Sequence, residues 1–270
     1  MRVKQVLRII FLMLLPVMCF SQEPVNKTDS HGLRQGLWKK QYSNGNLIYE
    51  GNFVDNKPVG EWKRYYQTGR IQADIIYPEN SDTAEAKLYD TIGKLIAAGH
   101  YLNEKKTGDW KYYSRGKLVS EDEYADGAKN GLSVTYYDTG EIFEKSEWKN
   151  GSMDGKYSVF FKNGQAFQVC MYKDNKRNGD CNIYYDNGNP ETSGFYKEGS
   201  RDGDWNFYTR EGAVSYTLKY DKGTLLNPEV ADSVENVKLD KLDQNKGKIA
   251  DPEKYIDDPS EYLRMYQGNR

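Results

Sequence analysis

The chain has 270 residues, of which 37% are hydrophobic and 14% aromatic, with 23 tyrosines and 25 glycines. Because aliphatic residues are few and tyrosine is abundant, the composition favours a thin β structure in which tyrosine rings pack while their hydroxyls stay hydrated. The 38 basic and 40 acidic residues give a net charge of -2. This balance provides no basic footprint for nucleic acid and no polybasic membrane patch, so nucleic acid is not expected as a partner and lipid contact is not favoured.

The first residues are typical of an export signal. Arg2 and Lys4 precede an apolar stretch from Val6 to Phe20, and Ser21 is a small residue before a cleavage site. This pattern predicts a signal peptide over residues 1–21 and a linker over residues 22–31. The protein is then bacterial and exported: periplasmic, outer-membrane associated or secreted. Two alternatives are a retained membrane anchor, although a span needs about 20 apolar residues, and a lipoprotein lipidated at Cys19.

An internal repeat of 24 residues extends over residues 32–226. A glycine followed two positions later by tryptophan occurs at Gly36, Gly60, Gly108 and Gly203, and the sequence between them keeps the same phase. The repeats begin at residues 36, 60, 84, 108, 131, 155, 179 and 203, with one step of 23. Each has a second glycine eight or nine residues later and an aromatic residue at or near the seventeenth position. Such periodicity indicates a repeat architecture.

Each repeat has the pattern of a β-hairpin. Asn44-Gly45, Asn163-Gly164 and Asn187-Gly188 are dipeptides that favour tight hairpin turns, and strand-forming residues flank them. The second connection, such as residues 54–59, is polar and longer. One hairpin is only marginally stable, so neighbouring hairpins must stack. The sequence therefore predicts an all-β fold, an elongated single-layer antiparallel sheet of about eight tandem hairpins.

The repeated aromatic residues are expected to hold neighbouring hairpins together. The residues expected in this structural role are Trp38, Trp62, Trp110, Trp205, Trp148, Tyr66, Tyr137 and Tyr185. An alternative is that part of this tyrosine-rich surface docks a partner, since tyrosine and tryptophan are favoured at interfaces.

The register of the repeat predicts a disulfide. Position two of one repeat is expected beside position fifteen of the preceding repeat, and large residues there face small ones, as Trp205 faces Gly194. Those two residues are 11 apart, and Cys170 and Cys181 have the same separation and the same positions. In an exported protein this favours a cross-strand disulfide over two free buried cysteines.

The repeat has a family resemblance, best seen in residues 60–71, Gly-Glu-Trp-Lys-Arg-Tyr-Tyr-Gln-Thr-Gly-Arg-Ile. It resembles the MORN repeat, and more closely the bacterial MORN-variant repeat that is often described as antitoxin-like. The resemblance implies a twisted sheet of hairpins that serves as a scaffold for protein or lipid contacts and has no catalytic residues. The antitoxin role fits poorly because this chain carries its own export signal. Repeat three, with Ala84 and Ala86, and repeat five, with Ser133 in place of tryptophan, depart from the pattern, and the sheet is expected to bend or loosen there.

The periodicity stops after Leu226, and residues 227–270 form a C-terminal tail. The tail is charged with spaced apolar residues, which is compatible with a short helix or with a flexible segment. Asp258-Pro259 is a possible helix start. A helix here would be useful if it covered the open edge of the last hairpin.

The sequence offers no catalytic, cofactor-binding or metal-binding motif. His31 and His100 lack a cysteine or histidine partner at metal spacing, and neither a phosphate-binding loop nor a nucleophile elbow is present. The expected function is that of an exported, non-enzymatic scaffold for contacts with a protein partner in the cell envelope or outside the cell. The alternative is a carbohydrate or cell-wall binding module that uses the aromatic sheet surface to bind a glycan.

Overall fold

The computed structural model describes residues 25–79 and 81–244. The predicted signal peptide and the possible helix start at residue 258 lie outside the described residues. The chain divides into two compact units. Unit 1 runs to Ala84 and includes residues 91–93, and unit 2 comprises residues 85–90 and the chain from Lys94 onward. The boundary falls in repeat three, one of the two repeats that depart from the sequence pattern.

Unit 1 is an antiparallel sheet whose strands pair with their neighbours in sequence. Its strands are β1 (Lys27–Thr28), β2 (Arg34–Gln41), β3 (Leu47–Val54), β4 (Lys57–Tyr65) and β5 (Ile71–Tyr77). The pairs are β1–β2, β2–β3, β3–β4 and β4–β5. Strand β1 lies within residues 22–31, which were predicted to be a linker, and it pairs with β2.

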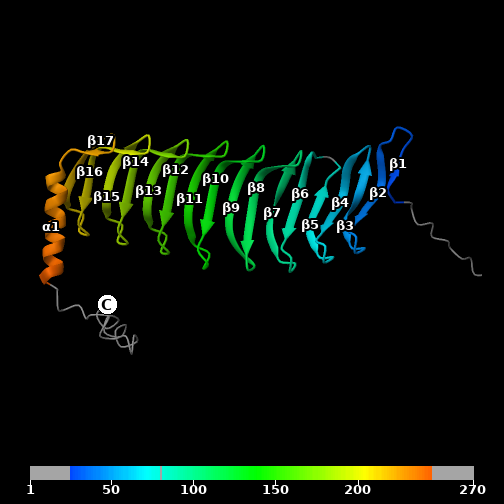
Figure 1. Cartoon of the computed structure of the whole chain (residues 1–270), viewed down its shortest axis with the longest axis horizontal. Helices are drawn as coiled ribbons and strands as arrows, with labels where there is room; N and C mark the ends of the chain where they lie inside the picture. The colour runs from blue at the N-terminus through cyan, green and yellow to red at the C-terminus, as the bar shows by residue number, and fades with distance from the viewer. Residues whose placement is uncertain (1–24, 80, 245–270) are drawn as a thin grey trace, which may run out of the picture. The chain divides into compact units, whose positions relative to one another are not determined.

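Unit 2, taken by itself, is also an array of antiparallel hairpins (Figure 1). Strand β6 (Thr83–Tyr89) begins at the boundary, and unit 2 then contains β7 (Leu95–Leu102), β8 (Lys105–Ser114), β9 (Lys117–Ala125), β10 (Ala128–Tyr136), β11 (Ile142–Lys149), β12 (Ser152–Phe160), β13 (Ala166–Lys173), β14 (Lys176–Tyr184), β15 (Pro190–Lys197), β16 (Ser200–Tyr208), β17 (Val214–Asp221), β18 (Thr224–Leu225) and α1 (Pro228–Gln244). From β7 to β18, each strand is antiparallel to the next. The predicted all-β fold of tandem hairpins is confirmed.

The two kinds of turn are the reverse of the prediction. The turn between β3 and β4 has only two residues, Asp55 and Asn56, both with positive φ of 50° and 66°. That geometry matches the right-handed twist of paired strands. At the connection between β2 and β3, the Gly45 N–H donates to the Tyr42 carbonyl, and of the residues in this turn only Gly45 has a positive φ. The turn types were predicted wrongly because Asn44 stabilises its turn through its side chain and not through a positive φ. The Asn44 Oδ1 atom accepts a hydrogen bond from the Asn46 N–H.

The shortened repeat is explained by its turn. Between β8 and β9 only Arg115 and Gly116 connect the strands, and both have positive φ, 51° and 78°. The equivalent connection elsewhere is longer. Repeat four therefore loses one residue by adopting the two-residue turn, and strand pairing continues on both sides.

The core is a row of side chains in which tryptophan lies against glycine. Trp110 and Trp205 are 0% and 2% exposed. A Cβ atom added to Gly194 would overlap the indole of Trp205, and Gly99 is related to Trp110 in the same way. The indole N–H of Trp205 donates to the Phe195 carbonyl at 3.1 Å. The predicted size compensation is present, and it buries these indole rings within a single layer of strands.

Repeat five does not loosen at Ser133. This residue is 6% exposed and its hydroxyl donates to the carboxylate of Asp122, which is also 6% exposed. The Nζ atom of Lys129 lies 2.9 Å from the same carboxylate. A buried polar cluster thus stands where four other repeats have tryptophan, and β9 pairs with β10 on both sides of it.

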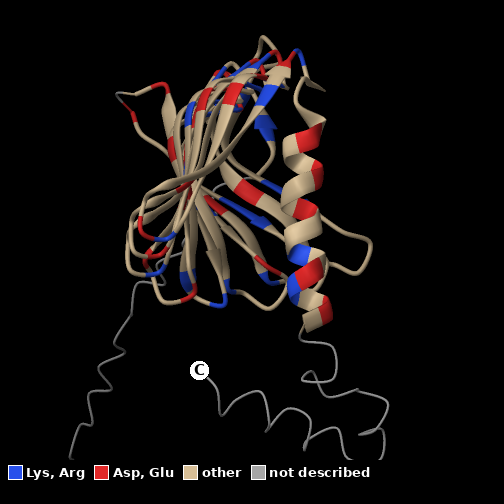
Figure 2. Cartoon of the chain, turned by 90° about the vertical axis from the view of Figure 1, so that its left-hand side faces the viewer, with Lys and Arg blue, Asp and Glu red and all other residues tan. Residues whose placement is uncertain are grey.

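Helix α1 lies at the β17 end of unit 2, and its visible side carries acidic residues (Figure 2). Val230 and Ala231 pack against the cluster that contains Trp205 and Leu218. Before the helix, the Asn227 side chain accepts from the Lys219 N–H and donates to the Thr217 carbonyl. The tail therefore begins as a helix, one of the two forms that its sequence allowed, and the first turn of this helix packs against the last hairpin.

Candidate functional site

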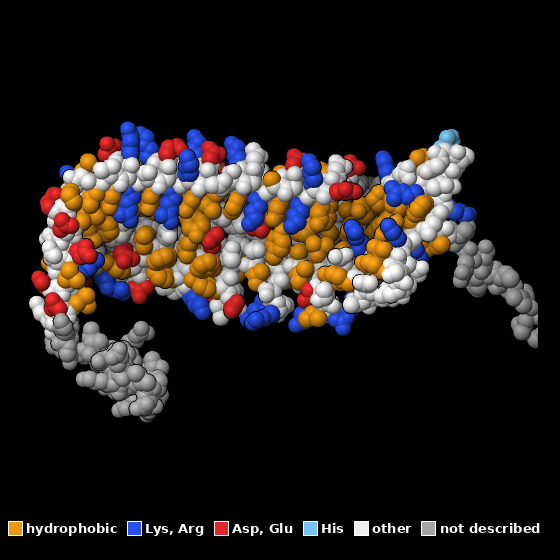
Figure 3. Space-filling model, in the orientation of Figure 1, with side chains coloured by type: hydrophobic (Ala, Val, Ile, Leu, Met, Phe, Trp, Pro, Cys, Tyr) orange, Lys and Arg blue, Asp and Glu red, His pale blue; other side chains and the backbone are white. Residues whose placement is uncertain are grey.

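One face of each unit carries the tryptophan row, and we call it the tryptophan face. Side chains alternate between faces along a strand, so directly paired residues share a face. In unit 1, Trp62 contacts Tyr49, Phe53 and Tyr77, with ring centroids 4.7 to 6.3 Å apart. In unit 2, Trp205 contacts Tyr196 at 4.9 Å. Figure 3 shows a band of hydrophobic side chains on one face of the molecule, with Lys and Arg among them.

Cations on the tryptophan face lie over aromatic rings. Five repeats have a basic residue two positions before their first glycine: Arg34, Lys106, Lys129, Arg177 and Arg201. The Lys106 Nζ atom is 4.4 Å from the Trp110 ring centroid, and the guanidinium carbon of Arg201 is 4.4 Å from that of Trp205. Burial lowers the pKa of Lys106. Ring faces attract such cations and hold them close to the sheet.

The opposite face uses carboxylates instead. Lys39 pairs with Glu50 at 2.9 Å and Lys111 with Glu121 at 3.1 Å, in each case across neighbouring strands. Tyr65 donates to Glu50 at 2.6 Å, and burial together with this hydrogen bond raises the pKa of Tyr65 to about 12. The opposite face thus contains lysine–glutamate pairs across neighbouring strands, whereas cations of the tryptophan face lie over aromatic rings.

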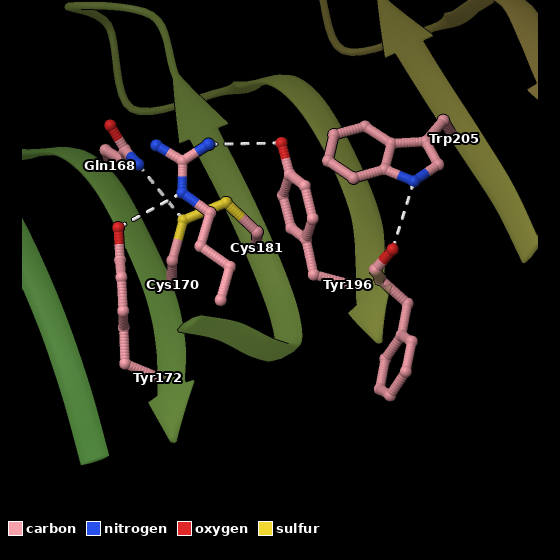
Figure 4. The surroundings of a disulfide bond; sticks show 8 residues. Gln168, Cys170, Tyr172, Cys181, Tyr196 and Trp205 are labelled. Carbon is pink, nitrogen blue, oxygen red and sulfur yellow. Dashed lines mark hydrogen bonds between the residues drawn. A yellow bond between two sulfur atoms is a disulfide. The ribbon is translucent and has the colours of Figure 1, made fainter. Parts of the chain in front are cut away.

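A continuous tyrosine–arginine ladder occupies the tryptophan face of β13 to β17. Its members, in spatial order, are Tyr172, Arg177, Tyr196, Arg201 and Tyr220. Arg177 donates from Nε to the Tyr172 hydroxyl and from Nη1 to the Tyr196 hydroxyl, both at 3.1 Å (Figure 4). Arg201 donates from Nη1 to the Tyr220 hydroxyl at 3.0 Å. The tyrosines thus hold both guanidinium groups in fixed orientations.

The predicted disulfide is present beside this ladder (Figure 4). Cys170 on β13 and Cys181 on β14 are directly paired and are 0% and 3% exposed. The Gln168 amide donates to the Cys170 sulfur at 3.1 Å. The disulfide takes the place of the glycine–tryptophan pairs such as Gly194–Trp205 and covalently joins strands β13 and β14 of repeats six and seven.

Four segments match the family model described as the MORN repeat variant: residues 34–55, 58–77, 129–150 and 177–198. The chain is a MORN-type repeat protein. Each matched segment begins two residues before the first glycine of its repeat, which is the position of Arg34, Lys129 and Arg177. The cations over the rings thus lie at the start of the MORN repeat.

No curated protein matches the chain significantly. One solved structure, described as "Crystal Structure of TcdB2-TccC3-TEV", is 11% identical to it with a TM-score of 0.16. That alignment covers 68% of this chain and 13% of the other, so the chain spans a small part of that protein's length. A similarity this low carries no information about function.

The aromatic residues singled out from the MORN repeats make contacts of two kinds, some between neighbouring repeats and some within one repeat. Tyr137 and Tyr185 donate to carbonyls 23 residues further on, at 2.7 and 2.9 Å, and the Trp148 indole donates to Ser146. Trp38 packs edge-on against Phe53. Tyr66 lies at the end of the β4–β5 hairpin, where its N–H donates to the Arg70 carbonyl. The hydrogen bonds of Tyr137 and Tyr185 join neighbouring repeats, and the role of the whole set in holding hairpins together stays a prediction.

Sequence reasoning missed the cations of the tryptophan face. Their signal was a basic residue recurring in phase with the first glycine of the MORN repeat, but their placement over rings required the register of the sheet. Among the described residues, no group of three or more His, Cys, Asp or Glu side chains is arranged to hold a metal ion. No helix within residues 25–79 and 81–244 has the length and apolar character of a membrane span.

Proposed function

We propose that this protein is an exported, non-enzymatic scaffold that binds a protein partner on the tryptophan face. The observation that carries the proposal is the asymmetry of the two faces. One presents aromatic residues with cations over them, and the other pairs Lys39 and Lys111 with glutamates on neighbouring strands. Tyrosine, tryptophan and arginine are the residues enriched in the energetically important parts of protein interfaces.

A glycan-binding module is the weaker candidate. Sugar recognition by stacking needs an open ring face, and the faces of Trp110 and Trp205 are buried and covered by Lys106 and Arg201. What the face presents to a partner is tyrosine edges and hydroxyls with guanidinium groups between them. That surface suits polar and charged protein side chains better than flat sugar rings.

Export is supported by two features. The first residues have the pattern of a signal peptide, and Cys170 and Cys181 form a disulfide, a bond that persists in oxidising compartments outside the cytosol. Cell fractionation with mass spectrometry tests this part of the proposal. We expect the protein in the envelope or the medium, with its N-terminus at residue 22; recovery of the intact chain from the cytosol would contradict export.

A matched pair of methionine substitutions tests the binding face. Met153 lies half-buried at the cation position of repeat six, on the tryptophan face, and Met171 is 39% exposed on the opposite face. We expect Met153→Glu to abolish cross-linking to the partner in the native host and Met171→Glu to leave it intact, because only the first places a carboxylate among the cations. Equal loss or equal retention in both variants would contradict docking on the tryptophan face.

A further inference from the structure

Two guanidinium groups on the tryptophan face have no carboxylate to neutralise them. Arg177 and Arg201 are half-buried, and their side chains bond to tyrosine hydroxyls. Among the described residues, neither forms an ion pair with a carboxylate, although Lys129 at the equivalent position pairs with Asp122 at 2.9 Å. A partly desolvated charge without a counter-charge is unfavourable.

The repeat register shows where the missing carboxylates would have been. In repeat five, position two is Ser133, and Asp122 lies 11 residues before it on the neighbouring strand. The carboxylate of Asp122 neutralises Lys129. The residues in that place beside Arg177 and Arg201 are Cys170 and Gly194, which carry no charge. The chain therefore supplies an internal carboxylate to Lys129, whereas the same place beside Arg177 and Arg201 carries no charge and leaves both guanidinium groups available to a ligand.

The guanidinium groups retain donors for such a ligand. A guanidinium has five N–H donors in a planar fork, and Arg177 uses two of them for Tyr172 and Tyr196. The remaining donors match the two oxygens of a carboxylate, which arginine binds in a bidentate manner. Because tyrosines fix the fork, little side-chain entropy is lost on binding.

The spacing of the two arginines limits the ligand. They occupy the same position in successive repeats, two strands apart, which corresponds to about 10 Å along the sheet. Three residues of an extended chain span about the same distance. Half-buried Phe207 and Tyr216 stack at 4.5 Å near Arg201 and add an apolar component to the same face.

We propose that the tyrosine–arginine ladder binds an acidic segment of a protein partner, with one carboxylate on Arg177 and a second, about 10 Å away, on Arg201. The proposal rests on the proposed function and specifies the chemistry of the partner. The partner carboxylates neutralise Arg177 and Arg201 as Asp122 neutralises Lys129. The occupant is identified by charge complementarity, since the ladder is cationic and, among the described residues, neither of its guanidinium groups forms an ion pair with a carboxylate.

The test uses the full chain and a fluorescein-labelled synthetic peptide with aspartate at every third position and leucine or serine between. Fluorescence anisotropy measures its affinity for wild type, Arg177→Gln, Arg201→Gln and the double variant. Arg210→Gln is the matched control, because Arg210 is an exposed arginine that pairs with Asp186 in the adjoining hairpin. Circular dichroism and melting temperatures establish that all variants are folded.

We expect each ladder substitution to weaken peptide binding about tenfold and the double variant to abolish it, with no effect of Arg210→Gln. A peptide with asparagine in place of aspartate should not bind. Equal binding of the asparagine peptide, or an Arg210→Gln effect as large as those of the ladder variants, would overturn the proposal.

Competing occupants are separated by further arms of the same experiment. Tighter ladder-dependent binding of polygalacturonate or of phosphatidylserine vesicles would overturn a peptide occupant. A large gain in peptide affinity when Asp251, Glu253, Asp257, Asp258 and Glu261 become amides would show that the chain's own acidic segment occupies the ladder. If the double variant still cross-links to its partner in the host, the ladder proposal fails while the scaffold function stands.

Discussion

Glycine and tryptophan act as one packing unit in the row of the tryptophan face. The indole of Trp205 lies so close to Gly194 that no Cβ atom fits between them, and its N–H reaches the Phe195 carbonyl at 3.1 Å. Gly194 does not have a positive φ, so its role here is to leave space for a ring rather than to allow an unusual backbone conformation. The small residue lets a thin sheet bury a large ring.

Gly194→Ala should destabilise the protein by about 1–3 kcal/mol because the added methyl group overlaps the Trp205 indole. Urea unfolding of unit 2 measures the loss. In a Trp205→Leu background, where the ring is absent, the same alanine should cost much less. Equal costs in the two backgrounds would show that the ring overlap is not the cause.

The Tyr65–Glu50 pair predicts a loss of stability at alkaline pH. Burial and the hydrogen bond to Glu50 raise the pKa of Tyr65 to about 12 in the folded state, while an unfolded tyrosine titrates near pH ~10. Between these values the unfolded chain has lost a proton that the folded chain keeps, so stability present below pH ~10 declines as the pH approaches 12. The urea midpoint of Tyr65→Phe should fall less steeply over this range. Identical slopes for variant and wild type would contradict this assignment.

At the scale of the hairpin, most connections are either two-residue turns or longer turns with one glycine in the left-handed region. Asp55 and Asn56 form a two-residue turn without any glycine, which is why their sequence resembled a loop. Strand pairing across both kinds of turn keeps the register, as the pairing of Gly51 with Trp38 and with Trp62 shows. The register was predictable from the 24-residue phase, but the turn types were not. Asparagine and aspartate occur in both kinds of turn, with positive φ at Asp55 and Asn56 but not at Asn44.

The Cys170–Cys181 disulfide joins strands β13 and β14 of successive repeats, and we expect it to stabilise the fold. The Cys170→Ser, Cys181→Ser double variant should be less stable than the oxidised wild type by about 2–3 kcal/mol, because an unfolded chain with this loop closed has less entropy. Thiol titration of the oxidised, denatured wild type should find neither cysteine reactive before reduction. Unchanged unfolding midpoints in the double variant would contradict a stabilising role.

On the scale of the whole molecule, repeats need protected ends. In unit 2 the last full strand, β17, is followed by the short β18 and by α1, whose first turns pack on the core cluster through Val230 and Ala231. The rest of α1 contacts little, and Val237 is 50% exposed. The helix therefore protects the end of the array through its first turns.

Val230→Asp should lower the melting temperature, corresponding to a loss of about 1–3 kcal/mol, because it places a charge against the Trp205 and Leu218 cluster. Val237→Asp is the control and should leave the melting temperature unchanged. Differential scanning calorimetry distinguishes them. A variant lacking residues 227–270 should also melt earlier and be less soluble. Equal melting of Val230→Asp and wild type would contradict an end-capping role.

The sequence alone determined the hairpin repeat, the size-compensated row and the disulfide. These features depend on residues 11 to 24 apart whose phase is visible in a single chain, as for Cys170 and Cys181. Only the tertiary structure decided which charges are neutralised. Lys129 has Asp122 whereas Arg177 and Arg201 have tyrosines, a difference set by which side chains the sheet brings to one face across neighbouring hairpins. The reason is physical: periodicity fixes where a side chain stands, but the free energy of a half-buried charge depends on which side chains surround it in space.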